Sequence, residues 1–189
     1  MNKSILDRYS RTANNAIIIE VTTDKVEDLY NNFDRSAPFI KKDLDDELTE
    51  YLVNAVGEIG NESFVILFRF ALLPDPDLVV RLKDSIRNYF QYMKTLQTQK
   101  LAKMIRRSTI FLLSGLLLLA LSIAVNSQTL NPQSIIINVF AQGLTIAAWV
   151  SMWEALANFL IRWAPYQKTR KIYNRIIKAD LIFEPPPGQ

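Results

Sequence analysis

The chain has 189 residues, of which 49% are hydrophobic, and a formal net charge of +3. It contains no cysteine and no histidine, which excludes disulfides, thiolate chemistry, haem ligation by histidine and the usual zinc sites. The motifs of serine hydrolases, P-loop proteins, dinucleotide-binding proteins and zinc proteases are also absent. We therefore expect a protein without catalytic residues, cofactor or metal, and not an enzyme.

The first elements predict a small strand-helix-strand unit. Ala16–Thr22 is a β-branched run typical of a strand. Asp43–Ile59 has apolar residues at helical spacing, with Asp43 as the expected N-cap. Ser63–Ala71 then follows as a second strand. A helix joining two strands favours a parallel pair.

Two strands alone are marginally stable in water, so the sheet needs another strand. Three sources are open: the tail segment Leu181–Glu184, a strand near Lys25–Tyr30, or a strand from a neighbouring subunit.

The segment Asp28–Asp43 between the first strand and the helix is long and rich in aromatic and turn residues. We expect it to be a partner-binding loop, with these candidate contact residues: Tyr30, Phe33, Asp34, Arg35 and Phe39. A second interpretation, in which Asp24, Glu27, Asp28 and Asp34 hold a divalent cation, lacks the spacing of a calcium loop. Such carboxylates more often cap turns.

After Asp75-Pro76-Asp77, apolar residues recur at spacings of three and four residues, and no helix breaker appears before Asn126. A continuous helix from Leu78 to Val125 would be about 70 Å long and would form a rigid stalk. The apolar stripe Leu82–Met104 fits either a coiled coil or, as we favour, a helix packed on the sheet of its own chain.

From Ser108 to Trp153 the chain carries no charged residue. A bilayer core needs roughly 20 apolar residues per helix, so we expect transmembrane spans at 109–125 and 135–163, joined by the polar turn 126–134. The alternative, a buried hairpin in a soluble protein, leaves too little other mass to cover it. The N-terminus lacks the apolar core of a cleavable signal peptide, so we expect the first span to be the insertion signal.

Basic residues flank both spans, whereas most Asp and Glu lie before residue 95. The positive-inside rule then places both termini in the cytoplasm of a bacterial inner membrane. Juxtamembrane cations are attracted to anionic lipids, and we expect these residues, rather than a nucleic-acid site, to contact lipid head groups: Lys103, Arg106, Arg107, Arg162, Lys168, Arg170 and Lys171.

Glu154 is the only charged residue inside the second span proper, and it shares a helix face with Ser151 and Asn158. These three residues are candidates either for lining a hydrated pore or, as we weigh it, for polar contacts between helices. Small residues at Ser114-Gly115 and at Ala141–Ala148 with Gly143 also favour close helix packing.

The expected fold class is an α+β membrane protein. Its parts are a cytoplasmic β-α-β-α head with an α/β core (1–77), a stalk helix (78–107), a transmembrane hairpin (108–163) and a C-terminal helix and tail (164–189). Asp28–Tyr51, taken with the two helices that follow, resembles a recurring pattern in small bacterial membrane proteins with two spans and a cytoplasmic α/β head. That resemblance implies no particular activity.

Three functions remain, of which the third is an accessory subunit of a larger transport complex. The first is a non-enzymatic membrane module whose head forms homo-oligomers through sheet edges or binds a cytoplasmic protein partner. The alternative is a small oligomeric ion channel with Glu154 facing a hydrated pathway.

Overall fold

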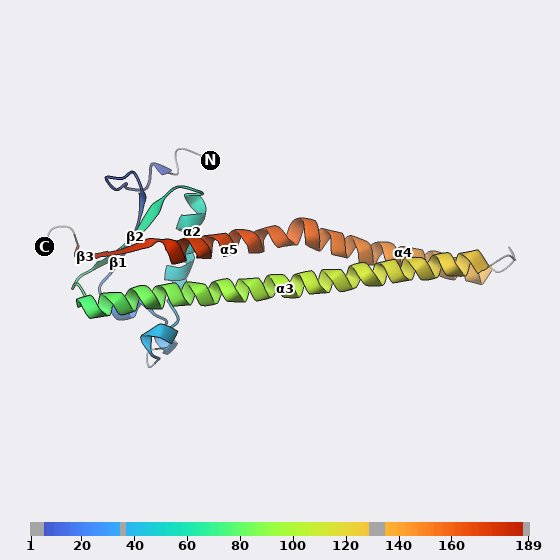
Figure 1. The fold of residues 1–189 in the computed structure, drawn as a ribbon, viewed down its shortest axis with the longest axis horizontal. Helices are drawn as coiled ribbons and strands as arrows, with labels where there is room; N and C mark the ends of the chain where they lie inside the picture. The colour runs from blue at the N-terminus through green and yellow to red at the C-terminus, as the bar shows by residue number, and fades with distance from the viewer. Residues whose placement is uncertain (1–5, 35–36, 129–134, 187–189) are drawn as a thin grey trace. The chain divides into compact units, whose positions relative to one another are not determined.

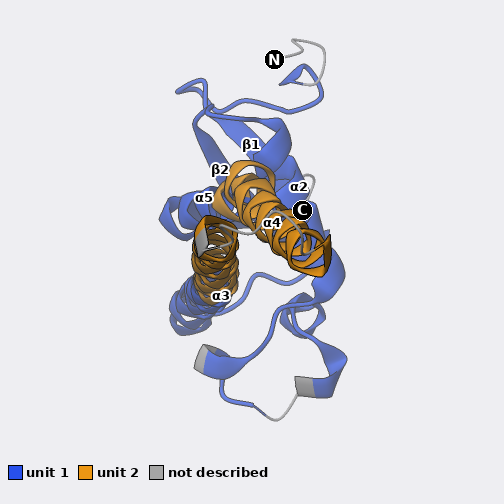
Figure 2. Ribbon diagram, turned by 90° about the vertical axis from the view of Figure 1, so that its right-hand side faces the viewer, with its two compact units in different colours: residues 1–96, 169–189 blue, residues 97–168 orange. Residues whose placement is uncertain are grey.

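The computed structural model describes residues 6–34, 37–128 and 135–186 (Figure 1). The fold is α+β and 69% helical, which confirms the predicted class at this level. The chain divides into two compact units (Figure 2). The head unit comprises residues 1–96 and 169–189, and the helical unit comprises residues 97–168.

The head unit contains a three-stranded sheet in the order β1-β2-β3, with both pairs parallel. The strands are β1 (Ile17–Thr23), β2 (Phe64–Phe70) and β3 (Asp180–Glu184). The strand that completes the sheet is thus the tail segment, one of the three predicted sources. The strand suggested near Lys25–Tyr30 was wrong, because Val26–Leu29 forms the 3-10 helix η1.

The helix α2 (Asp46–Glu58) begins later than predicted, and its N-cap is Asp45 rather than Asp43. The Asp45 carboxylate accepts hydrogen bonds from the backbone N–H groups of Glu47 and Leu48. The reason for the shift is tertiary: Leu44 pairs with Tyr30 in an antiparallel β-bridge, which keeps residues 43–45 extended. Gly60, with φ of 61°, follows the helix end in the left-handed conformation that favours glycine.

The outer edge of β1 is occupied by the chain itself. The backbone N–H of Ile18 donates to the carbonyl of Ser10, and the Tyr51 hydroxyl donates to the carbonyl of Glu20 at 2.9 Å. Because residues 18 and 20 of a strand point their backbone polar groups to the same edge, these contacts block that edge.

The head core lies between the sheet and three helices: α2, the start of α3 (Pro76–Gln128) and the end of α5 (Trp163–Lys178). From α3 it receives Leu82, Ile86 and Phe90, all buried. The Phe90 ring lies 5.8 Å from that of Tyr173 on α5. The apolar stripe at the start of α3 therefore packs on the head core, as favoured above, and burying each such side chain contributes about 1.5–3 kcal/mol.

The helical unit contains the rest of α3, which as a single 53-residue helix includes the predicted Leu78–Val125 segment. It also contains α4 (Ile135–Ala157), the π-helix η4 (Asn158–Arg162) and the beginning of α5. Two helices, Pro76–Ser127 and Ile135–Lys178, are long and apolar enough to cross a membrane.

Small and polar side chains join the two helices of this unit. The Ser122 hydroxyl donates to the carbonyl of Ala141 at 2.8 Å and lies 2.7 Å from the Thr145 hydroxyl. Gly115 meets α4 so closely that an added Cβ would lie 2.7 Å from Cγ of Met152. Gly143, by contrast, has no atom within 4 Å of such a Cβ, so it does not serve the close packing predicted for it.

Candidate functional sites

The predicted partner loop forms short 3-10 helices, and part of it packs on α3. It contains η1 (Val26–Leu29), η2 (Asn32–Asp34) and η3 (Phe39–Lys41). The Ser85 hydroxyl on α3 donates to the carbonyl of Phe39 at 2.6 Å. The Tyr30 and Phe39 rings meet edge to face at 5.8 Å, and the Lys42 ammonium lies 5.2 and 4.8 Å from their centroids. These contacts fix the loop backbone against the helix.

The five predicted loop residues have different environments. Tyr30 is a core residue with 4% exposure, and Phe39 is partly buried against the same core. Phe33 is fully exposed at 100%, and its backbone N–H donates to the Asn31 side chain in a local turn. Asp34 belongs to η2, but its side chain, like the whole of Arg35, lies outside the described residues.

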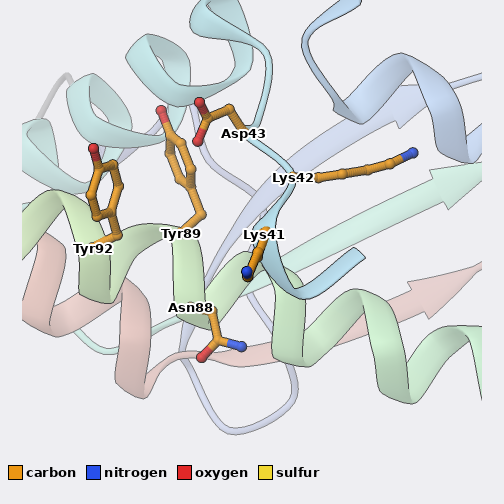
Figure 3. Close-up of a pocket in the computed structure, with 6 residues that line it drawn as sticks. All are labelled: Lys41, Lys42, Asp43, Asn88, Tyr89 and Tyr92. Atoms are coloured by element: carbon orange, nitrogen blue, oxygen red, sulfur yellow. The ribbon is translucent and has the colours of Figure 1, made fainter. Parts of the chain in front are cut away.

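Two clefts lie between the segment 38–43 and α3. One, of about 340 Å³, is shown in Figure 3, where the rings of Tyr89 and Tyr92 extend from α3 toward α2 and Lys42 points away from them. Its lining residues are Lys41, Lys42, Asp43, Asn88, Tyr89 and Tyr92. The second cleft, of about 400 Å³, is lined by Pro38, Phe39, Arg81 and Asp84.

Charge and burial differ along these clefts. Lys41, Asp43 and Arg81 are exposed, whereas Tyr89 is 8% exposed and its hydroxyl lies 3.3 Å from that of Thr49. Burial raises the pKa of Tyr89, so the hydroxyl stays neutral and serves as a hydrogen-bonding group. The α3 residues of both clefts were not predicted, because they are some 45 positions from the loop and only the tertiary fold brings them together.

The acidic residues near the loop act locally. The Asp28 carboxylate accepts hydrogen bonds from the Thr23 hydroxyl at 3.2 Å and from the backbone N–H of Lys25 at 3.1 Å. This is the turn-capping role that such carboxylates commonly have. Within residues 6–34, 37–128 and 135–186, no group of three acidic side chains is placed to hold a metal ion.

The second candidate site is a polar cluster in the helical unit. The Arg162 guanidinium donates to the Glu154 carboxylate at 3.1 Å and to the side-chain carbonyl of Asn158 at 3.0 Å. The Asn158 amide also lies 3.4 Å from the Glu154 carboxylate, and Asn158 is buried with 3% exposure. Ser151 is half-buried, and no hydrogen bond joins it to this cluster in the described part of the chain.

The π-helix η4 explains why Glu154 and Arg162 meet. Eight residues along a regular α-helix turn by about 800°, which leaves the two side chains about 80° apart. The wider turns of η4 rotate less per residue and so bring Arg162 back toward Glu154. Pro165, placed just after η4, conflicts with a regular α-helical backbone at Ile161 and accounts for the irregularity there.

A basic cleft of about 310 Å³ adjoins this cluster. It is lined from α3 by Lys103, Met104 and Arg107, and from η4 and α5 by Asn158, Arg162 and Tyr166. Three of the predicted lipid contacts therefore share one cleft. Met104 and Tyr166 were not predicted there, although their spacing of one turn from Arg107 and Arg162 is visible in the sequence.

The other predicted lipid contacts lie elsewhere. Arg106 and Lys168 are exposed in the helical unit. Arg170 and Lys171 belong to the head unit, where they line a cleft of about 410 Å³ with Asn61, Lys94, Asn174 and Arg175.

Comparisons of the chain with protein-family models, with curated proteins and with solved structures found no match.

Proposed function

We propose that this chain is a non-enzymatic protein of a bacterial inner membrane, with two spans and a cytoplasmic head that binds a protein partner. Exposure of the apolar segments supports membrane insertion, because only 17% and 11% of their most apolar stretches are buried. A core helix of a soluble protein would bury most of this surface.

The head unit is built from two distant parts of the chain, and this arrangement supports a hairpin topology. Strand β3 pairs with β2, although 109 residues separate Phe70 from Asp180 and both candidate spans lie between them. A sheet built from both ends of the chain requires both ends on the same side of the membrane, and therefore an even number of crossings. The basic flanks support a cytoplasmic location for that side.

The observation that carries partner binding is the docking of segment 38–43 on α3, which leaves a cleft on the helix surface at each of two positions. A fixed backbone lowers the entropy lost on binding. Lys41, Lys42 and Arg81 line the clefts together with Asp43 and Asp84, which leaves one surplus positive charge, and fully exposed Phe33 adds an apolar contact nearby in the sequence. This chemistry fits an acidic segment of a cytoplasmic protein.

Partner binding is favoured over self-association through sheet edges. The outer edge of β1 is blocked by the contacts of Ile18 and Glu20. A symmetric antiparallel pairing of two β3 strands about Ile182 would place Asp180 opposite Glu184 of the second copy. Like charges directly opposite destabilise such a pair.

The test is site-specific photocrosslinking of the full chain in native membranes, with the crosslinker at Phe33 and, separately, at Lys41. We expect both positions to crosslink one acidic protein, and Lys41→Glu to abolish the product formed from position 33. A crosslinker at exposed Glu50 on α2 is the matched control and should give no such product. Crosslinks to a second copy of this chain would instead establish self-association and overturn the proposal.

The ion-channel alternative is less well supported. Arg162 and Asn158 of the same chain satisfy the Glu154 carboxylate, so this charge needs no hydrated pathway to explain it. The mass of the complex in lipid nanodiscs decides the point. A ring of five or more copies, with a conductance changed by Glu154→Gln, would favour the channel, whereas a monomer or dimer would exclude a central pore.

A further inference from the structure

The basic cleft between α3 and the segment η4–α5 has the features of a binding site for one phosphate group. Two of its cations, Lys103 and Arg107, lie one turn apart on α3, and the third, Arg162, lines the cleft from η4. Among the residues that the structure describes, none that lines the cleft carries a carboxylate. Its volume, about 310 Å³, is at the small end of the range for ligand sites, roughly 300–1,000 Å³.

The arginines of the cleft are held by neighbouring side chains. The Arg107 guanidinium lies 5.4 Å from the Phe111 ring centroid, which limits its orientations. One nitrogen of Arg162 donates to both Glu154 and Asn158. A guanidinium has five N–H donors, so Arg162 retains others for a ligand, and its side chain is 60% exposed.

The net charge of the site matches a phosphate. Three cations line the cleft, and the adjoining Glu154 offsets one of them, which leaves a surplus of about two positive charges. Glu154 and buried Asn158 thus orient Arg162 toward the cleft. This role differs from lining a pore and from packing helices together. An arginine pair with a lysine is a donor set well suited to phosphate oxygens.

The sequence position of the cleft favours a phosphate attached to apolar tails. Lys103 and Arg107 immediately precede the uncharged run that starts at Ser108, and Arg162 lies at the end of the second apolar segment. Trp163 and Tyr166 beside it are residue types enriched where a membrane meets water. Head-group phosphates occupy this depth, and basic pockets between membrane helices are known to bind anionic lipids.

We propose that this cleft binds the phosphate of one anionic phospholipid per chain. The inference rests on the membrane insertion proposed above but not on the partner surface of the head. It goes beyond general attraction of basic flanks to a charged membrane, because it assigns one lipid to one cleft and excludes neighbouring cations such as Arg106.

The test uses the full chain in detergent, with retained lipid counted by native mass spectrometry after addition of phosphatidic acid, phosphatidylglycerol or phosphatidylcholine. We expect one anionic lipid per chain to be retained, and phosphatidylcholine not to be. Arg107→Gln and Arg162→Gln should each weaken retention about tenfold or more, the size expected for hydrogen bonds to a charged group. Arg106→Gln removes the same charge one residue away and should leave retention unchanged.

Inorganic phosphate and pyrophosphate distinguish the two possible sources of the ligand. Retention of the lipid in their presence assigns the site to phospholipid, whereas binding of free phosphate without lipid retention overturns the lipid assignment. Equal losses for Arg106→Gln and Arg107→Gln would show diffuse attraction only and would also overturn the proposal.

Misfolding and failed membrane insertion are each distinguished from a loss of lipid binding by a control. Far-UV circular dichroism checks the helicity of each variant, and Lys103→Gln repeats the test if either arginine variant fails to fold. Arg107→Lys, which keeps the charge but loses the planar donor pair, should bind with intermediate strength. Resistance of the wild-type chain to alkaline extraction from membranes measures insertion independently, so a failure of insertion is distinguished from a loss of phosphate binding by the cleft.

Discussion

Arg175 on α5 binds three carbonyl groups, one in the last turn of α2 and two in the segment that follows it. Its guanidinium donates to the carbonyls of Val56, Gly60 and Glu62, the last at 2.6 Å, and lies 4.9 Å from the Phe64 ring. Carbonyls at a helix C-terminus lack partners within the helix, so this cation satisfies them. Burial lowers the pKa of Arg175, but the group remains charged at any physiological pH.

We expect Arg175→Met to lower the free energy of unfolding of the head by about 2–3 kcal/mol, because hydrogen bonds from a charged group are lost and buried carbonyls are left unsatisfied. Urea unfolding followed by circular dichroism measures the change. Lys171→Met, at an exposed position on the same helix, is the control and should change stability by less than about 0.5 kcal/mol. Equal effects of the two variants would contradict this role for Arg175.

Ionisation of the Tyr9 hydroxyl is expected to lower the stability of the folded chain at alkaline pH. Burial, together with a 2.8 Å hydrogen bond to the Glu58 carboxylate, raises the pKa of Tyr9 from 10.0 to about 12. Above pH 10 the unfolded chain releases this proton while the folded chain retains it, so the folded state binds more protons. Stability contributed by Tyr9 is therefore complete below pH 10 and is lost as the pH rises to about 12.

We expect Tyr9→Phe to reduce the loss of stability between pH 10 and 12, measured as urea midpoints at several pH values. Tyr92→Phe, at a side chain with 54% exposure, is the control and should leave the pH dependence as in the wild type. An unchanged slope in Tyr9→Phe would show that other groups determine the alkaline limit.

At the scale of elements, α3 and α4 lie in close contact at Gly115. A Cβ there would meet Met152 at 2.7 Å and the carbonyl oxygen of Ala148 at 3.0 Å, whereas a Cβ at Gly143 would meet nothing within 4 Å. Contacts of small residues are what bring helices together in membranes. Replacing each glycine by the same residue therefore distinguishes the effect of interhelical packing on stability from the effect of helix propensity.

We expect Gly115→Ala to destabilise the helix pair by about 1–3 kcal/mol, the usual effect of overpacking. Gly143→Ala should be neutral or slightly stabilising, because alanine favours helix over glycine. Unfolding of the full chain by a denaturing detergent, followed by circular dichroism, gives both values. Destabilisation by Gly143→Ala to the same extent would contradict the contact at Gly115.

At the scale of the whole molecule, the two units should respond differently to urea. Lipid or detergent cannot replace the backbone hydrogen bonds of an apolar helix, so such helices persist where a water-exposed unit unfolds. All three tryptophans, Trp149, Trp153 and Trp163, lie in the helical unit and therefore report on it alone.

We expect urea to produce a cooperative loss of circular dichroism from the head while tryptophan fluorescence of the reconstituted chain stays constant. Arg175→Met should lower the urea midpoint of the circular dichroism transition and should leave the tryptophan fluorescence unchanged. Coincident transitions by both probes would show instead that the chain unfolds as one two-state unit.

Much of the secondary structure follows from local sequence. Apolar spacing predicts α2 and the long helix α3, and β-branched or apolar runs predict β1 and β2, because these patterns reflect which side of each element is buried. Length and lack of charge in the same way select the two helices able to cross a membrane.

Tertiary contacts decided the rest. Leu44 looks like part of a helix in sequence, but its bridge to Tyr30 delays the start of α2 to Asp46. Tyr30 and Phe39 have the composition of a recognition loop, yet packing on α3 turns both toward the core and leaves Phe33 exposed.

The type of most elements, the two apolar segments and the basic residues beside them can be read from the sequence, since these features depend on local composition and periodicity. The three-dimensional fold was needed to show that the tail strand completes the sheet, that Arg162 contacts Glu154 through a π-helix, and that Lys103, Arg107 and Arg162 line one cleft. These features join residues far apart in the chain or depend on a backbone irregularity, and apart from Pro165, which disfavours a regular α-helix near η4, no local pattern encodes them.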